Sequence, residues 1–177
     1  MPNSPFGRVS IERHGAKTDK GQNMSTDFED RLAARGLSLP DAPPPAANYV
    51  PYVVSGRTVY VSGQVSMNEA GFITGKVGSD LTVEEGAAAA ETCALALLAQ
   101  ARKACGGDIS RLKRVVKLVG FVNSTPEFEQ QPAVINGASD LIVELLGETG
   151  RHARSAVSAG ALPFNVAVEI EGIFEIE

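Results

Sequence analysis

Residues 82–122 are the most informative about the fold class, and they read TVEEGAAAAETCALALLAQARKACGGDISRLKRVVKLVGFV. Thr82 and Glu85 have the spacing of a capping box, and the Ala- and Leu-rich run behind them predicts a long helix. Gly106-Gly107 ends that helix. The next run, 112–122, is apolar and β-branched, which predicts a buried strand. A capped helix leading into a buried strand indicates a domain that contains both helices and a sheet.

The flanking sequence supplies the rest of that sheet. Four further runs of β-branched and aromatic residues predict strands: 49–54, 58–62, 154–158 and 166–176. Ser55-Gly56-Arg57 joins the first two into a hairpin, and 72–77 is either an edge strand or a loop. Thr125-Pro126 is an N-cap followed by an N1 proline and predicts a helix that ends at Gly147. This order predicts an α+β fold in which one sheet is covered on one face by two helices.

The chain before the hairpin divides into two parts. Residues 1–23 show no hydrophobic periodicity, and they are either an upstream or vector-derived leader, with Met24 as the natural start, or a genuine flexible arm. Thr26 and Glu29 have capping-box spacing, which predicts a helix that stops at Gly36. A chain of 177 residues fits one domain. We place that domain at 24–177, with its core at 48–177.

Composition excludes several classes of function. The chain carries 16 Lys and Arg against 21 Asp and Glu, a formal net charge of -5, which argues against broad binding of nucleic acids or anionic membranes. No apolar run reaches the length of a membrane span, and no signal peptide is apparent. Cys93 and Cys105 would lie about 18 Å apart on one helix, too far for a disulfide. We therefore expect a soluble, cytoplasmic protein with reduced, buried cysteines and no metal site.

Few residues stand out as candidates for chemistry. The sequence lacks a nucleophile elbow, a Walker loop, a Rossmann fingerprint and a zinc-protease helix, and His152 is the only histidine after residue 23. Glu169 and Glu171 point to one face of the last strand, where either both are simply solvated or one of them is an acid/base in a cleft. Arg154 is either a surface arginine or a fork that binds a substrate carboxylate.

An ordered set of short motifs adds a sharper expectation. The motifs are Asn48-Tyr49-Val50, Val61-Ser62-Gly63-Gln64, Asn136-Gly137-Ala138-Ser139, Ala153-Arg154-Ser155, Leu162-Pro163 and Val168-Glu169-Ile170-Glu171. In this order they resemble the Rid family (reactive intermediate deaminases, also called YjgF-like or L-PSP-like). The stretch 147–154 resembles a longer branch of that family. The resemblance implies a chorismate-mutase-like α+β fold and a homotrimer with three sites in the clefts between subunits.

The same resemblance implies an activity and its residues. Family members hydrolyse 2-imino acids, formed from enamines, to 2-oxo acids and ammonia without a metal or an organic cofactor. Arg154 would bind the substrate carboxylate, and Glu169 would position or activate the hydrolytic water. The cleft would be completed by a pocket-lining tyrosine, by backbone or hydroxyl contacts and by a supporting amide: Tyr49, Ser62, Gly63 and Asn136.

Two positions depart from the family pattern. Ala156 stands where members often have cysteine, so a thiol-dependent step is not expected, although a contact through its backbone carbonyl remains available. The longer loop places His152 next to Arg154 in sequence, where it would alter the substrate that fits. A non-catalytic trimer that binds a small carboxylate or a protein is the alternative. An endoribonuclease ranks third, because the acidic chain lacks a basic stripe and a histidine pair.

Overall fold

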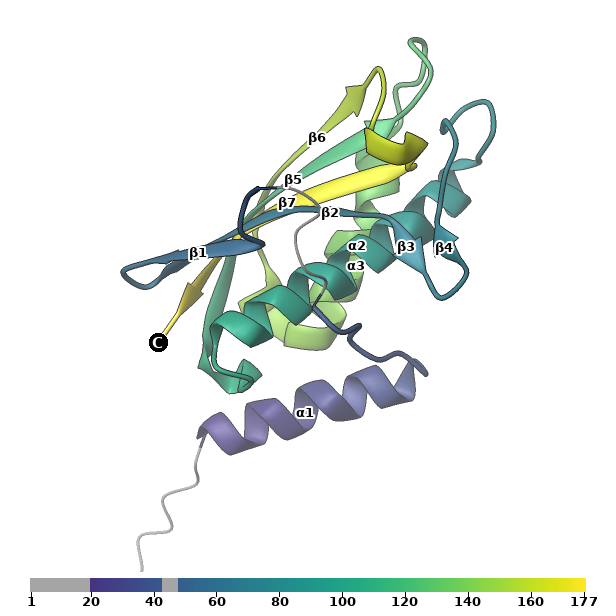
Figure 1. Ribbon diagram of the computed structural model, residues 1–177. Helices are drawn as coiled ribbons and strands as arrows, with labels where there is room; N and C mark the ends of the chain where they lie inside the picture. The colour runs from purple at the N-terminus through teal and green to yellow at the C-terminus, as the bar shows by residue number, and fades with distance from the viewer. Residues whose placement is uncertain (1–19, 43–47) are drawn as a thin grey trace, which may run out of the picture.

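The computed structural model describes residues 20–42 and 48–177 (Figure 1). Within these residues the helices and strands follow in the order α1 Lys20–Ala34, β1 Tyr52–Ser55, β2 Thr58–Val65, β3 Met67–Asn68, β4 Gly71–Phe72, α2 Val83–Ala104, β5 Leu112–Asn123, α3 Gln131–Leu146, β6 Ala153–Ala159 and β7 Val168–Ile176. Three short 3-10 turns lie at Ile109–Arg111, Gly147–Gly150 and Pro163–Asn165. The prediction of a leader or flexible arm falls mostly on residues 1–19, outside the described residues.

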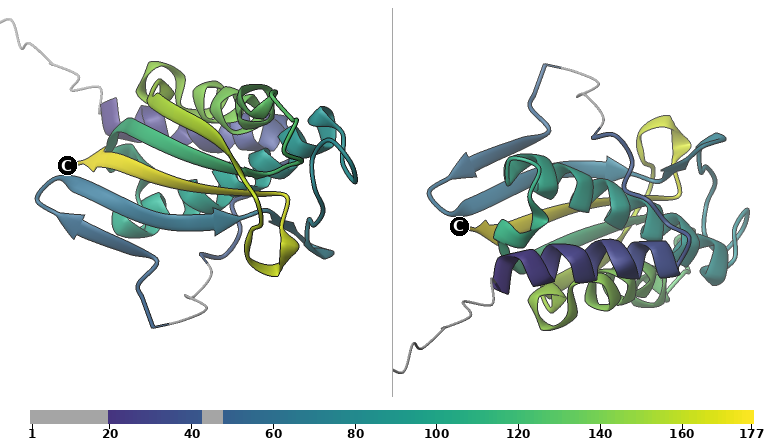
Figure 2. Two further views of the ribbon diagram at one scale, coloured as in Figure 1. Left: turned by 90° about the horizontal axis from the view of Figure 1, so that it is seen from above. Right: turned by 90° about the horizontal axis from the view of Figure 1, so that it is seen from below.

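In the described part of the chain, five strands form the main sheet in the order β1-β2-β7-β5-β6. All neighbours are antiparallel except β5 and β6, which are parallel, and β3 pairs with β4 in a separate small ribbon. α2 and α3 cover one face of the main sheet, as Figures 1 and 2 show. This arrangement confirms the predicted α+β fold. Of residues 72–77, Phe72 ends the β3–β4 ribbon, Thr74 forms an isolated bridge with Val166, and Val77 forms isolated bridges with Leu81 and Ser124.

α2 is built as its sequence predicts. The Thr82 hydroxyl accepts a hydrogen bond from the Glu85 backbone N–H, and the Glu85 carboxylate accepts one from the Thr82 backbone, which completes the capping box. Gly106 and Gly107 follow the helix with φ of 72° and 95°, a left-handed backbone that glycine adopts without strain. α2 and α3 pack closely where Gly137 of α3 meets the α2 backbone, because a Cβ at Gly137 would lie 2.7 Å from the Ala87 carbonyl carbon.

The predicted start of α3 is wrong. Thr125-Pro126 belongs to a turn after β5, and the helix begins at Gln131 with Gln130 as its N-cap. Pro132 therefore occupies the first turn, where its missing N–H costs no helical hydrogen bond. The predicted end at Gly147 is confirmed.

α1 packs against the outer side of the helix layer, as the right-hand view of Figure 2 shows. It begins at Lys20, so Thr26 lies inside the helix and is not its N-cap, which corrects the predicted start. The predicted stop is confirmed at Gly36, whose φ is 63°. Phe28 and Leu32 are buried against the domain. The helix is therefore part of the same hydrophobic core.

The other face of the main sheet, which we call the open face, carries no helix in the described part of the chain (Figure 2, left). Along β7, Val168 and Ile170 are buried toward the helices, so Glu169, Glu171 and Ile173 point to the open face. A shallow pocket on this face is lined by Tyr60, Val61, Lys117, Val119, Glu171, Gly172 and Ile173.

The two cysteines are free and buried, as predicted. Burial raises the pKa of the Cys93 thiol, which donates to the Val168 carbonyl at 3.5 Å. In the described residues, no helix combines the length and the apolar character that crossing a membrane requires.

Candidate active site

Arg154 lies on the edge strand β6, on the side of the sheet that faces the helices. It pairs in register with Leu118 of β5, which is fully buried under the helix layer. Its Nη1 donates to Asn136 Oδ1 at 2.9 Å and to Ser139 Oγ at 3.0 Å. Its Nη2 donates to the Pro132 carbonyl at 3.3 Å. Three acceptors of α3 thus fix the plane of one half-buried guanidinium.

The spacing of these acceptors explains why α3 can supply all three. Pro132, Asn136 and Ser139 are separated by four and three residues, so they lie along one face of the helix. A guanidinium has five N–H donors, and the described residues accept three of them. Nε–H and one N–H of Nη2 remain. Arginine binds carboxylates through such pairs of donors.

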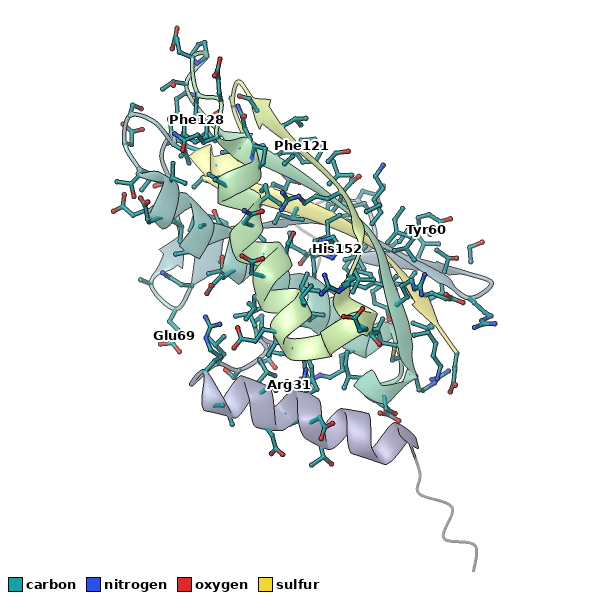
Figure 3. All side chains as sticks on the ribbon, turned by 180° about the vertical axis from the view of Figure 1, so that it is seen from behind. Arg31, Tyr60, Glu69, Phe121, Phe128 and His152 are labelled. Atoms are coloured by element: carbon teal, nitrogen blue, oxygen red, sulfur yellow. The ribbon has the colours of Figure 1, made fainter. Side chains whose placement is uncertain are left out.

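His152 lies directly beside this group, between α3 and the start of β6 (Figure 3). Its Nδ1 is 2.6 Å from the Gly150 carbonyl oxygen, and its Nε2 is 3.0 Å from Ser139 Oγ. Both ring nitrogens therefore have partners within the chain. His152 and Arg154 thus lie close together, as predicted, and both contact Ser139.

Glu169 lies on the open face of β7, opposite Val65 of β2 and Phe121 of β5. Its carboxyl group occupies space that only glycine leaves free, because a Cβ at Gly63 would lie 2.8 Å from the Glu169 carboxyl carbon. The β2–β7 register shifts between Val61 and Gln64, so Gly63 sits in a bulge. Glycine in this bulge is what allows the carboxylate to lie against β2.

The environment of Glu169 favours its neutral form. Burial raises the pKa of the Glu169 carboxyl, and the neighbouring charge of Glu171 raises this pKa further. A raised pKa makes a carboxylate a stronger proton acceptor than an ordinary surface glutamate. Of the two glutamates predicted to share one face, Glu169 is thus the better acid/base candidate.

The remaining predicted residues divide between the two sides. Ser62 donates from Oγ to the Val50 carbonyl at 3.0 Å, which ties the segment carrying Tyr49 to β2. Tyr49 is 48% exposed. Ala156 follows Arg154 on the helix-facing side of β6, where it pairs with Gly120 and packs against the core.

The predicted site residues therefore form two groups within one subunit. The Arg154 group consists of Asn136, His152, Arg154 and Ala156, at β6 and α3. The Glu169 group consists of Tyr49, Ser62, Gly63 and Glu169, at β2, β7 and the segment before β1. β5 lies between β6 and β7, and the two charged side chains leave opposite faces of the sheet. The fold of this chain does not bring them together.

Sequence reasoning missed Ser139 and Pro132 as partners of the guanidinium. Ser139 belongs to the motif Asn136-Gly137-Ala138-Ser139, but the sequence assigns it no role. The sequence signal for Ser139 is its spacing of three residues from Asn136, which places both side chains on one face of the helix. The strand that carries Arg154 packs against that face.

Comparisons with known proteins agree with this fold. Residues 29–174 match the family described as "YjgF/chorismate_mutase-like, putative endoribonuclease". The chain is 50% identical to Protein TCP17 of Trypanosoma cruzi over 159 residues, which is 86% of this chain and 99% of the relative. The crystal structure of Atu1372 from Agrobacterium tumefaciens, a protein of unknown function, superposes with a TM-score of 0.83 at 52% identity, covering 88% of this chain and 96% of the other.

A more distant relative has a stated activity. The 2-iminobutanoate/2-iminopropanoate deaminase of Dermatophagoides farinae is 34% identical over 145 residues, covering 81% of this chain and 97% of the relative. The family match spans most of the chain, from α1 to the last strand. The chain therefore belongs to the YjgF/chorismate-mutase-like family, in agreement with the resemblance to Rid proteins.

Proposed function

We propose that this protein hydrolyses 2-imino and enamine acids to 2-oxo acids and ammonia, in clefts between the subunits of a homotrimer. The observation that carries the proposal is the fixed guanidinium of Arg154. Asn136, Ser139 and Pro132 accept three of its five N–H donors. Nε–H and one Nη2–H are left to bind the carboxylate that every such substrate carries.

The chemistry needs only a few groups beyond this anchor. Water adds to the C=N carbon of the bound imine, and the resulting carbinolamine releases ammonia and leaves a 2-oxo acid. A carboxylate with a raised pKa can take the proton of the attacking water and, as the carboxylic acid, return it to the departing nitrogen. We assign this role to Glu169, because burial and Glu171 raise its pKa. Neither a metal nor an organic cofactor is part of this mechanism.

A second subunit is needed to bring Glu169 to Arg154, since these side chains leave opposite faces of one sheet. The open face supplies a surface for such contacts. Tyr60 is 49% and Val157 is 45% exposed there, beside the apolar side chains of Val119, Phe121 and Ile173. Burying this surface between copies of the chain would stabilise an oligomer. The name of the Dermatophagoides farinae relative, 2-iminobutanoate/2-iminopropanoate deaminase, supports the substrate class.

A coupled assay tests the proposal. A dehydratase generates 2-iminobutanoate, and ammonia release is followed with and without the purified protein. We expect acceleration by the wild type and a fall of about a hundredfold or more in kcat/KM for Arg154→Ala, which loses two charge-assisted hydrogen bonds to substrate. Arg151→Ala is the matched control, because Arg151 is exposed and pairs only with Glu148 among the described residues. No acceleration by the wild type would overturn the proposal.

Glu169→Gln separates catalysis from binding. We expect kcat to fall by about 10²- to 10⁴-fold, the contribution of a general acid/base, with 2-oxobutanoate still bound. Wild-type protein that binds 2-oxobutanoate but does not accelerate imine hydrolysis would instead indicate a non-catalytic carboxylate-binding protein. Thermal shift with 2-oxobutanoate measures that binding directly.

A further inference from the structure

A chain of hydrogen bonds leads from the Gly150 backbone through His152 and Ser139 to Arg154. A carbonyl oxygen only accepts hydrogen bonds, so Nδ1 of His152 carries the proton in its 2.6 Å contact with Gly150. In the neutral ring Nε2 is then an acceptor, and it accepts a hydrogen bond from the Ser139 hydroxyl at 3.0 Å. Ser139 Oγ in turn accepts from Arg154 Nη1 at 3.0 Å. All donors in the chain point the same way.

Both ends of this chain of hydrogen bonds are fixed to α3. Gly150 is buried, and a Cβ there would lie 2.5 Å from the Ile142 carbonyl oxygen and 3.0 Å from Val143 Cα. The Gly150 carbonyl is therefore fixed against α3. At the other end, Asn136 of the same helix accepts the second hydrogen of Nη1 at 2.9 Å.

We propose that His152 and Ser139 are positioning residues that orient Arg154 for the substrate carboxylate. This inference rests on the proposed function. With both hydrogens of Nη1 occupied, the guanidinium presents Nε–H and one Nη2–H to the cleft. Without the Ser139 hydroxyl, Nη1 regains a free donor and the guanidinium can turn. His152 acts through Ser139 and does not touch substrate, because both ring nitrogens are occupied.

The tautomer of His152 tests the hydrogen-bond chain without substrate. The full chain contains two histidines, His14 and His152, so a ¹⁵N NMR spectrum of the imidazole rings assigns readily with His14→Gln. At a pH where the ring is neutral, we expect protonated Nδ1 and unprotonated Nε2 for His152. The opposite tautomer, with the proton on Nε2, would overturn the proposal.

Ligand affinity tests the positioning role itself. Calorimetry with 2-oxobutanoate should give a dissociation constant about tenfold weaker for Ser139→Ala, which removes one hydrogen bond to the charged guanidinium. His152→Ala removes only the hydrogen bond that orients the Ser139 hydroxyl, so it should weaken binding by a smaller factor. Ser139→Thr keeps the hydroxyl and should bind within about twofold of wild type. In the coupled assay the same variants should raise KM and leave kcat within about twofold, because Glu169 is untouched.

Asp140→Ala is the matched control, because this exposed residue follows Ser139 on the same helix. Wild-type affinity in Ser139→Ala, combined with weakened binding in Arg154→Ala, would overturn the positioning role alone. Wild-type affinity in Arg154→Ala would overturn the proposed function and the positioning role with it. The two failures are therefore distinguishable.

Discussion

Replacing Gly63 by alanine perturbs the candidate acid/base without touching it. The new Cβ would lie 2.8 Å from the Glu169 carboxyl carbon, whereas carbon atoms prefer separations of about 3.5–4.0 Å. The carboxyl group must therefore move by roughly 1 Å. Gly63 has no positive φ, so alanine fits its backbone and the effect is purely steric.

A displacement of this size has a large expected effect on turnover. A misplacement of about 1 Å can lower the rate about a hundredfold, so kcat of Gly63→Ala should fall by that order. KM should change little, because Arg154 lies in the other group of residues. The free energy of unfolding should fall by about 1–3 kcal/mol, the usual cost of overpacking.

Coupled kinetics and urea unfolding measure both effects. Gly160→Ala is the matched control, since a Cβ at Gly160 meets no atom within 4 Å. In Gly63→Ala/Glu169→Ala the steric conflict is gone, so the stability losses of the two single variants should not add. A kcat of Gly63→Ala within twofold of wild type would refute the reasoning about Glu169.

Three further predictions concern stability. Because the pKa of Glu169 is raised, its contribution to stability is full below the ordinary pKa of glutamate and is lost as pH rises through the raised value. Glu169→Gln should therefore raise Tm at neutral pH and leave it unchanged at about pH 4; equal shifts at both pH values would contradict this. Phe28→Ala should lower the free energy of unfolding by about 3–5 kcal/mol in urea titrations, since Phe28 of α1 is 1% exposed. Asp30→Ala is the control, because Asp30 is exposed on the same helix and its loss should not change this free energy. Equal effects of the two variants would show that α1 is not docked. Gly137→Ala should lower the free energy of unfolding by about 1–3 kcal/mol or more in the same titration, because its Cβ would clash with the Ala87 backbone and push α2 away from α3. A variant as stable as wild type would contradict the close packing of the two helices.

The sequence predicts best those elements whose signals are local. The capping box at Thr82 and the glycines after α2 fix that helix within its own residues. The alternation of Val168 and Ile170 with Glu169 likewise reports which face of β7 is buried. In both cases the signal lies within the element itself.

The starts of α1 and α3 were mispredicted for a shared reason. Thr26 and Thr125 have capping patterns, but the pattern at Thr26 falls inside a helix and the one at Thr125 falls in a turn. Capping preferences are worth about 1 kcal/mol, less than the tertiary packing that docks Phe28 or sets where α3 crosses the sheet.

The candidate site depends on contacts that no spacing encodes. Arg154 and Asn136 are eighteen residues apart and meet only because β6 packs beside α3. The link through Ser139 requires the position of the Gly147–Gly150 turn, which sets the His152 ring. The resemblance to a family named most of these residues, but the hydrogen-bond partners came from the three-dimensional arrangement.

The central claim is that Arg154 of one subunit and Glu169 of another complete one site. Co-expression of Arg154→Ala and Glu169→Gln chains tests it most directly, because each variant alone should be inactive. In randomly mixed cyclic trimers, about a quarter of the clefts would pair an intact Arg154 with an intact Glu169, so about a quarter of the wild-type rate of imine hydrolysis should return. Mixed oligomers that remain as inactive as their parents would contradict the claim.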